Sequence, residues 1–411
     1  MSKVIPDYWK EITVQECCEI LDNQRIPLNS DERYLMKGDI PYYGANGVVD
    51  WINDYIFDQE LILIAEDGGN FEDYENRAIA YKISGKSWVN NHAHILKVKL
   101  EYDYNFIFYS LEHKNVINVI KGGTRSKLNQ SELKEIQILS PKNVIEQQKI
   151  ASILENVDNN IDKTQEIIEK YEMMKQGLMH DLFNKGIDEN GKPHTEFKDS
   201  ELGIIPNNWD EVTLESVISK ILDFRGKTPK KIGMEWGNGE ITALSANNVE
   251  MGNINFEKET YYGSEDLYDK WMNRGDCEFK DIIMTMEAPL GNIAQIPDNR
   301  RYILSQRVIL FKLNINKVKN DYLAHFLRSD YFQGQLIKYS SGTTAKGIQQ
   351  SQLLKLKVKI PKLISEQNKI SEVLNSIEDK IQSEKKYLYK LQKIKTGLMQ
   401  DLLTGKVRVK T

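Results

Sequence analysis

The segment PKNVIEQQKIASILENVDNNID, which begins at Pro141, recurs as PKLISEQNKISEVLNSIEDKIQ from Pro361. The similarity continues to the end of each segment, and 15 of 44 positions are identical between residues 141–184 and 361–404. Such a recurrence within one chain of 411 residues indicates an internal repeat. The chain is therefore expected to contain two copies of one structural unit.

The similarity between the copies extends upstream of these segments but is interrupted. KGGTRSKLNQSELKEIQILSP, from Lys121, matches SSGTTAKGIQQSQLLKLKVKIP, from Ser340, and Trp9 in DYWKEITVQE matches Trp209 in NNWDEVTLES. Between these anchors the copies diverge strongly. This pattern favours a shared scaffold that carries two different recognition surfaces. Gene duplication followed by drift is the alternative.

Both repeated segments have the hydrophobic pattern of a coiled coil. Alternating steps of four and three residues define ten positions in each copy, and eight of the ten are apolar or aromatic. The first set is Ile150, Leu154, Val157, Ile161, Thr164, Ile168, Tyr171, Lys175, Leu178 and Leu182; the second is Ile370, Leu374, Ile377, Ile381, Glu384, Leu388, Leu391, Lys395, Leu398 and Leu402. A seam with this period needs a helical partner, and the other copy is the nearest one.

The length of these helices suggests a spacer. About 40 helical residues extend about 60 Å at a rise of 1.5 Å per residue. If the two helices are antiparallel, the globular domains lie at opposite ends of the pair and can read two separated DNA half-sites. A coiled coil that serves only oligomerisation is the alternative.

The rest of the sequence predicts two mixed α/β domains. Strand patterns occur at LILIAE (61–66), AIAYKI (78–83) and HILKVK (94–99), followed by the helix YNFIFYSLEH. The second half repeats this order with DIIMTME (281–287), RVILFKL (307–313), one helix DYLAHFLRSDYFQGQLIKY and the strand LKVKI. The expected division is recognition domain 1 at 1–140, spacer helix 1 at 141–186, a polar linker at 187–205, recognition domain 2 at 206–360 and spacer helix 2 at 361–411.

Composition predicts a soluble, cytoplasmic protein. No apolar stretch approaches the length of about 18 residues that spans a membrane, and the start of the chain does not resemble a secretion signal. Cys17 and Cys18 are adjacent and Cys277 is distant, so neither a disulfide framework nor a C-x-x-C site is expected. A reducing compartment fits this cysteine usage.

The charge is unevenly distributed. The net charge of −5 separates into −12 for residues 1–205 and +7 for residues 206–411. Phosphate binding favours a surplus of Lys and Arg. If this chain binds DNA, it therefore uses local basic patches or shares the contact with basic partners.

The usual signatures of enzymes and metal sites are incomplete. SGKS at Ser84 and RGKT at Arg225 resemble the end of a phosphate-binding loop, but Ala80 and Ile221 replace the leading glycine. No Asn-Pro-Pro-aromatic sequence of the amino-methyltransferase type is present, and EFK at Glu196 lies in the linker. His92 and His94 have no accompanying ligand cluster, so a strand edge or DNA-facing loop is expected for them instead of a metal site. No catalytic, cofactor or metal site is predicted.

Polar loops supply the candidate DNA-binding residues. Arg suits guanine edges, Asn and Gln suit adenine edges, and glycines let backbone N–H groups approach phosphates. Each such loop could also be an ordinary turn, but these loops occur at equivalent places in the two copies. The candidates are Tyr42, Tyr43, Asn46, Asn70, Asn91, His92, Thr124, Arg125 and Lys127 in the first half, and Arg225, Lys227, Thr228, Lys230, Asn247, Asn292, Arg307, Thr343, Thr344 and Lys346 in the second.

Taken together, these segments resemble the specificity subunits of type I restriction-modification systems. The resemblance rests on HTEFKDSELGIIPNNW (194–209), on the GGTR and SGTT segments, and on the paired EQQKIASILENVDNNID and EQNKISEVLNSIEDKI helices with GLMHDLF and GLMQDLL. It covers essentially the whole chain. It implies an α+β fold of two target recognition domains joined by two long antiparallel coiled-coil helices with a pseudo-twofold repeat.

The resemblance also implies a function and partners. In such a subunit each domain reads one half of a bipartite, asymmetric target in double-stranded DNA. Two modification (methyltransferase) subunits dock on the helices and restriction subunits join them, while S-adenosylmethionine, ATP and Mg belong to those partners. The isolated chain could also self-associate. Two other interpretations remain: a coiled-coil assembly scaffold that does not read DNA, and a self-sufficient DNA-modifying enzyme.

Overall fold

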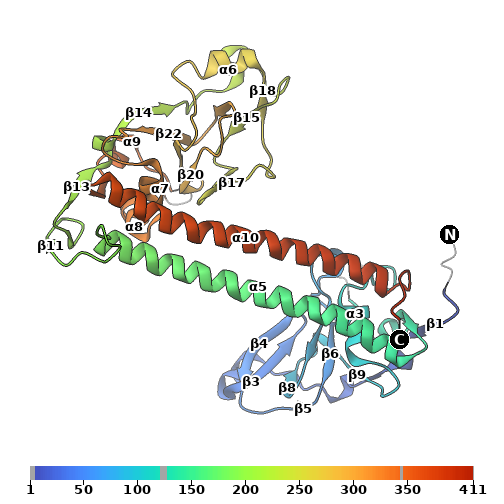
Figure 1. Ribbon diagram of the computed structural model, residues 1–411. Helices are drawn as coiled ribbons and strands as arrows, with labels where there is room; N and C mark the ends of the chain where they lie inside the picture. The colour runs from blue at the N-terminus through green and yellow to red at the C-terminus, as the bar shows by residue number, and fades with distance from the viewer. Residues whose placement is uncertain (1–4, 121–126, 343–345, 411) are drawn as a thin grey trace. The chain divides into compact units, whose positions relative to one another are not determined.

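The computed structural model describes residues 5–120, 127–342 and 346–410. The chain divides into two compact units, residues 1–167 with 384–411 and residues 168–383 (Figure 1). Two long helices, α5 (Val144–Lys185) and α10 (Ile364–Leu402), each contribute one half to each unit. Every unit therefore contains a globular part and two helix halves.

The globular part of the first unit contains two four-stranded sheets. One has the order β2-β9-β6-β7 and is antiparallel throughout, and the other has the order β4-β3-β8-β5. The strands are β1 Trp9–Thr13, β2 Cys18–Ile20, β3 Lys37–Gly44, β4 Gly47–Ile52, β5 Phe57–Asp58, β6 Leu61–Ala65, β7 Ala80–Ile83, β8 Lys86–Val89, β9 Ala93–Val98 and β10 Gln137–Pro141. The helices are α1 Val14–Cys17, η1 Asp22–Gln24, α2 Ser30–Leu35, η2 Phe71–Asp73, α3 Tyr104–Glu112 and α4 Gln130–Lys134. The central strand β6 is buried along its whole length.

The second unit repeats the first of these sheets. Its antiparallel sheet has the order β14-β22-β19-β20, and a three-stranded sheet has the order β18-β15-β21. The strands are β11 Phe197–Lys198, β12 Ile205–Pro206, β13 Trp209–Thr213, β14 Ile218–Asp223, β15 Ile241–Leu244, β16 Val249–Glu250, β17 Asn253–Ile254, β18 Tyr262–Gly263, β19 Ile282–Met286, β20 Leu290–Gln295, β21 Tyr302–Leu304, β22 Val308–Leu313 and β23 Lys357–Pro361. The helices are η3 Leu214–Val217, η4 Pro229–Ile232, α6 Glu265–Trp271, α7 Asn320–Arg328, α8 Asp330–Lys338 and α9 Gln350–Leu353.

The internal repeat is visible in the strand that opens each domain. Trp9 of β1 pairs with Pro141 of β10, and Trp209 of β13 pairs with Pro361 of β23. Both tryptophan side chains are buried. Each domain thus closes on the strand that leads directly into its long helix. The predicted mixed fold with two related domains is confirmed.

A glutamine at the start of each long helix fixes the domain to that helix. Oε1 of Gln147 accepts from the backbone N of Asp103 at 2.9 Å, and its Nε2 donates to the carbonyl of Pro141 at 3.0 Å. Gln367 makes the same pair of bonds, accepting from the backbone N of Lys319 at 2.8 Å and donating to the carbonyl of Pro361 at 2.9 Å. Because both glutamines are buried, these bonds are shielded from water and define one geometry.

Within each unit the two helix halves pack in antiparallel directions. In the first unit, Ile150 near the start of α5 shares a hydrophobic core with Leu402 at the end of α10. In the second unit, Leu182 near the end of α5 shares a core with Ile370 near the start of α10. The predicted antiparallel seam is confirmed in both units.

The two lysines of the seam are paired with carboxylates. Nζ of Lys175 lies 2.5 Å from Glu378 in the second unit, and Nζ of Lys395 lies 2.9 Å from Asp158 in the first. Glu112 of α3 adds a second contact to Lys395 at 3.0 Å. Burial opposes the charge on Lys395, but Glu112 and Asp158 outweigh it and raise the pKa of that lysine.

One local prediction was wrong. The segment 321–339 was expected to be one helix, but it forms α7 and α8, which are separated at Ser329. The Ser329 side chain accepts from the backbone N of Phe332 and caps α8, a role in which serine is favoured. The predicted linker, residues 187–205, includes β11, which pairs with β12.

His325 of α7 is buried against α10. Its Nε2 lies 2.7 Å from Oδ1 of Asn375, and its Nδ1 lies 3.0 Å from a guanidinium nitrogen of Arg328. Burial and the neighbouring Arg328 lower the pKa of His325 to about 4. The ring is therefore neutral at pH 7, with Nε2 as the donor to Asn375 and Nδ1 as the acceptor from Arg328.

This neutral histidine predicts an acid-sensitive stability. The unfolded chain, whose histidine pKa is about 6.5, binds more protons than the folded chain between about pH 4 and 6.5. The free energy of unfolding should therefore fall as pH drops through this window, by at most about 3 kcal/mol from this group. Denaturant unfolding at pH 7, 5.5 and 4.5 measures it. In His325→Gln this contribution should be absent, and an equal pH dependence in both proteins would contradict the assignment.

Candidate nucleic-acid interface

Charged side chains gather in the first unit where the central strand β6 ends. Glu66, directly after β6, lies 2.5 Å from Arg25 and 3.1 Å from Nζ of Lys127. Asp67 forms a β-bridge with Lys127, and its carboxylate lies 2.7 Å from Nδ1 of His92. Burial alone would raise the pKa of Glu66, but the bonds from Arg25 and Lys127 hold it below its usual value. Lys127 and His92, both predicted from sequence, thus lie in one polar cluster.

Two asparagines bind backbone carbonyl groups of loop residues near this cluster. Nδ2 of Asn46, in the turn between β3 and β4, donates to the carbonyl of Gly68 at 2.9 Å. Nδ2 of Asn70 donates to the carbonyl of Ala78 at 3.0 Å. Asn46 and Asn91 are exposed and Asn70 is half-buried. The structure therefore gathers these three predicted residues around the end of the same sheet.

The second unit has charged residues at the equivalent strand ends. Glu287, after β19, forms a β-bridge with Gly347, and these two positions correspond through the internal repeat to Asp67 and Lys127. Nε of Arg307 lies 3.6 Å from Glu287. At the end of β14, the Arg225 guanidinium binds both oxygens of Asp223 at 2.6 to 3.1 Å. The two copies therefore place different charged side chains on one shared framework.

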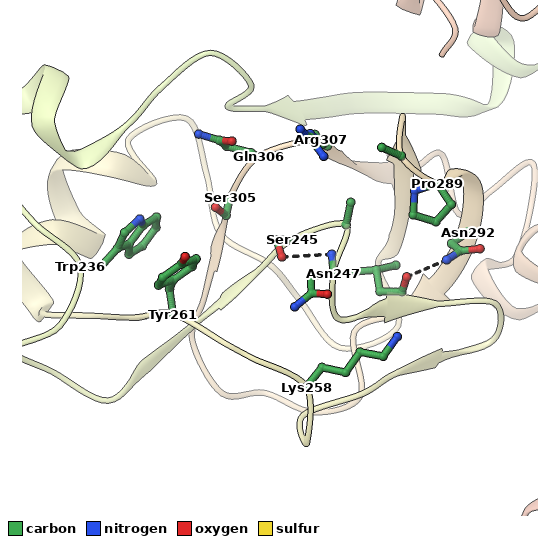
Figure 2. Close-up of a pocket in the computed structure, with 13 residues that line it drawn as sticks. Trp236, Ser245, Asn247, Lys258, Tyr261, Pro289, Asn292, Ser305, Gln306 and Arg307 are labelled. Atoms are coloured by element: carbon green, nitrogen blue, oxygen red, sulfur yellow. Dashed lines mark hydrogen bonds between the residues drawn. The ribbon is translucent and has the colours of Figure 1, made fainter. Parts of the chain in front are cut away.

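A cavity of about 600 Å³ adjoins these residues in the second unit (Figure 2). Its main lining comes from three segments, residues 245–249, 288–292 and 305–307, and it brings together the predicted residues Asn247, Asn292 and Arg307. Asn292 lies in β20 and not in a loop. Nδ2 of Asn247 donates to the carbonyl of Glu259 and Nδ2 of Asn292 to the carbonyl of Val249, each at 2.9 Å. Since these bonds use one donor of each amide, the side chains are held in place before any ligand binds.

Arg307 has an unusual backbone conformation. Its φ of 66° lies in the left-handed region that residues other than glycine rarely adopt. Its carbonyl accepts from the backbone N of Met286 at 2.8 Å, which fixes the turn before β22. Residues in such conformations cluster at functional sites. The side chain is about half exposed, so its guanidinium is available for a ligand at the cavity.

Several cavity residues were not predicted individually. Trp236 stacks on Tyr261 with ring centroids 5.7 Å apart and an interplanar angle of 18°, forming an aromatic wall. Lys258, Ser305 and Gln306 also line the cavity. Ser305 and Gln306 directly precede the predicted Arg307 in the sequence, so their position could have identified them as site residues. No sequence spacing connects Trp236 or Tyr261 to the cavity.

Other predicted residues of the second unit follow β14 in sequence. Nζ of Lys227 packs over the Phe224 ring at 5.1 Å and donates to the carbonyl of Trp271 at 3.3 Å. Burial and Arg274 lower its pKa. Thr228 precedes η4 as its N-cap, and Lys230 in η4 is exposed.

Some predicted residues have other environments. Tyr42 is 1% exposed, and its hydroxyl accepts from the backbone N of Leu28 at 3.0 Å, so it belongs to the core. Tyr43 is half-buried with its ring 6.0 Å from that of Tyr81. His94 was expected at a strand edge or in a loop, but it is buried in β9, which pairs on both sides; that expectation was wrong.

The remaining predicted residues belong to the GGTR and SGTT sequence segments or directly follow them. Lys346 is exposed beside the bridging Gly347. Thr124, Arg125, Thr343 and Thr344 lie outside the described residues.

The described part of the chain offers neither a metal cluster nor a membrane span. Within residues 5–120, 127–342 and 346–410, no group of three or more His, Cys, Asp or Glu side chains could hold a metal ion. None of the helices in these ranges is both long and apolar enough to cross a membrane.

The fold and these strand-end clusters define a class: proteins with two divergent copies of an α/β domain, each attached to a long helix of a shared antiparallel pair. The chain belongs to the family described as the type I restriction modification DNA specificity domain, whose model matches residues 6–173 and 206–393. The family predicted from the sequence is thereby confirmed.

Individual relatives agree with this assignment. The chain is 28% identical to the type I restriction enzyme MjaVIII specificity subunit of Methanocaldococcus jannaschii, over 99% of this chain and 94% of that protein. It is 32% identical to the putative MjaX specificity subunit of the same organism, over 74% of this chain and 68% of that protein. The crystal structure of the S subunit of a type I system from M. genitalium has the same fold, with a TM-score of 0.65, 16% identity and coverage of 98% and 97% of the two chains.

Proposed function

We propose that this chain is the non-catalytic DNA-reading subunit of a type I restriction-modification complex. Its domains, residues 1–140 and 206–360, each recognise one half of a bipartite, asymmetric sequence in double-stranded DNA. The strand-end clusters supply the contacts, Lys127, His92 and Asn46 in the first domain and Arg307, Asn247 and Asn292 in the second.

One observation carries this proposal: the bridges of Asp67 with Lys127 and of Glu287 with Gly347 are equivalent, yet the side chains around them differ. A repeated framework with different polar groups can read two different half-sites. Arg and Asn are the residue types that bind guanine and adenine edges. The partial neutralisation of Arg225 by Asp223 and of Lys127 by Glu66 limits non-specific phosphate binding, which is consistent with an acidic chain.

The long helices serve partner docking in this proposal. Modification (methyltransferase) subunits bind the helix pair, restriction subunits complete the complex, and these partners hold S-adenosylmethionine, ATP and Mg. Residues 141–186 and 361–411 would then form the invariant part of the chain, joined to the second domain by the linker 187–205. Turnover of DNA by the purified chain, with only a metal ion or a methyl donor added, would instead support a self-sufficient enzyme.

The Arg307→Ala variant is expected to weaken DNA binding by about 5- to 150-fold, the range for loss of one good base contact. The measurement uses the chain reconstituted with its modification subunit and a duplex whose sequence comes from the methylated positions in cells. Two further duplexes, each with one half-site scrambled, identify the half that Arg307 reads. The loss should disappear when the half read by the second domain is scrambled.

Arg300→Ala is the matched control, because Arg300 lies in the same unit, is 65% exposed at its side chain and is paired with Asp298. The affinity of Arg300→Ala for the duplex should equal that of the wild type. Equal losses in both variants, or no loss in Arg307→Ala, would count against the cavity as the reading site. A coiled-coil scaffold without DNA reading predicts the second of these results.

A further inference from the structure

His94 occupies a buried position beneath the charged cluster of the first unit. Its Nδ1 lies 2.6 Å from Oδ2 of Asp22, and its Nε2 lies 2.7 Å from the backbone carbonyl of Leu128. The ring is 1% exposed, and Oδ1 of Asp22 accepts from the backbone N of Ile95 at 3.0 Å. A carboxylate and a carbonyl are both acceptors, so the ring fills both bonds only when both nitrogens carry a proton.

The bond to Leu128 connects the sheet to the segment that carries Lys127. The backbone N of Leu128 donates to the carbonyl of Glu66 at 2.8 Å, and the Leu128 side chain is buried. On the same segment, Lys127 bridges to Asp67 and its ammonium contacts Glu66. His94 therefore holds the carbonyl next to a residue that we place in the DNA-reading surface.

The second unit provides an internal comparison for this position. His94 pairs with Ile64 of β6, and Ile309 pairs with Met284 of β19, which is the counterpart of Ile64 in the internal repeat. Ile309 thus takes the place of His94. Ile309 is fully buried, as is His94, and the equivalent β-bridge forms beside it.

The fold therefore does not require a polar side chain at this place. Burying an ion pair is often no more stabilising than burying apolar residues of similar volume. The charged arrangement in the first unit consequently points to a role other than stability.

We propose that His94 is a positioning residue for DNA reading by the first domain: its bond to the Leu128 carbonyl fixes the segment that presents Lys127. The inference rests on the proposed function. The charged groups around the ring come from three elements, Asp22 of η1, Glu66 after β6, and Arg25 and Lys127 bound to Glu66. The second domain has the apolar Ile309 at this place, so it lacks this bond.

The test uses the full chain with its modification subunit. His94→Phe, which keeps a ring but no donor, should bind a duplex with the first half-site intact about tenfold more weakly than the wild type, the effect of one lost hydrogen bond. With that half scrambled, the two proteins should bind equally. Asp22→Asn, which weakens the bond that orients the ring, should lower the affinity for the intact duplex in the same direction.

His113→Phe is the matched control, since His113 lies in the same domain and its Nδ1 bonds to the carbonyl of Tyr74 instead of that of Leu128. It should retain the wild-type affinity. An equal loss for both half-sites in His94→Phe would overturn the inference, as would His94→Phe with wild-type affinity. If His94→Phe does not fold, Asp22→Asn decides alone, and wild-type affinity in that variant refutes the role of the ring.

Amide hydrogen exchange at Lys127 and Leu128 without DNA separates this inference from the proposed function. Exchange at these two amides should accelerate in His94→Phe. If the wild-type complex binds no duplex while this exchange pattern holds, the proposed function fails and the positioning by His94 stands. If the complex binds DNA but exchange is unchanged in His94→Phe, the positioning role fails alone.

Discussion

Removing one heptad from each long helix, residues 163–169 of α5 and 384–390 of α10, is expected to shorten the spacer of the proposed bipartite DNA target by about three base pairs. Seven helical residues correspond to about 10 Å, and one base pair to about 3.4 Å. Each deleted segment lies between the positions of the two lysine pairs, Lys395 with Asp158 and Lys175 with Glu378. A whole heptad keeps the seam residues in register.

The methylated positions in cells that carry the variant and its modification subunit measure the new spacer. Binding to the original target should be lost, while each half-site sequence should stay the same. Deleting residues 163–169 alone is the control: it shifts one helix against the other and should abolish specific methylation. An unchanged spacer in the double deletion would refute the view that the helices set the separation.

Replacing Lys395 by methionine is expected to lower the free energy of unfolding by about 3 to 5 kcal/mol, the cost of leaving a buried charge without its partner. Glu112 is 8% exposed and Asp158 is partly buried, and both contact Lys395. Without the ammonium group these two carboxylates repel each other in a poorly solvated place. Chemical denaturation at pH 7 provides the measurement.

Lys393→Met is the control for this change, because Lys393 is exposed two residues away and packs only over Tyr389 among the contacts of the described chain. A surface change of this kind should alter stability by less than about 0.5 kcal/mol. Adding Glu112→Gln and Asp158→Asn to Lys395→Met should restore part of the loss. If Lys395→Met is as stable as the control, the seam pair contributes no stability.

The sequence predicted the elements whose pattern is local and repeated. The seam from Ile150 to Leu182 follows from a 3.5-residue period, and the strands β6 and β19 follow from short apolar runs. The internal repeat also predicted that both domains share a framework, because equivalent residues such as Gln147 and Gln367 occupy equivalent sequence positions. These features depend on neighbours along the chain, which a sequence displays directly.

The composition of the site depends on distant residues and was predicted only in part. Asn247, Asn292 and Arg307 were identified from their loops, but their convergence on one cavity follows from sheet topology that no spacing reveals. Tyr42 has the residue type and loop context of a DNA contact, yet its hydroxyl bonds to Leu28 and its ring is buried. His94 was weighed as a metal ligand or loop residue because its partners, Asp22 and Leu128, are distant in sequence.

The paired bonds of Gln147 and Gln367 have a consequence for how such chains change over time. The bonds that the two glutamines have in common go to backbone groups, the amide of residue 103 or 319 and the carbonyl of the proline that ends the last strand. Backbone groups are present whatever the side chains are. A recombination event that replaces everything between β1 and β10, or between β13 and β23, therefore preserves the hydrogen bonds that connect each domain to its long helix. The two domains are free to diversify as interchangeable modules.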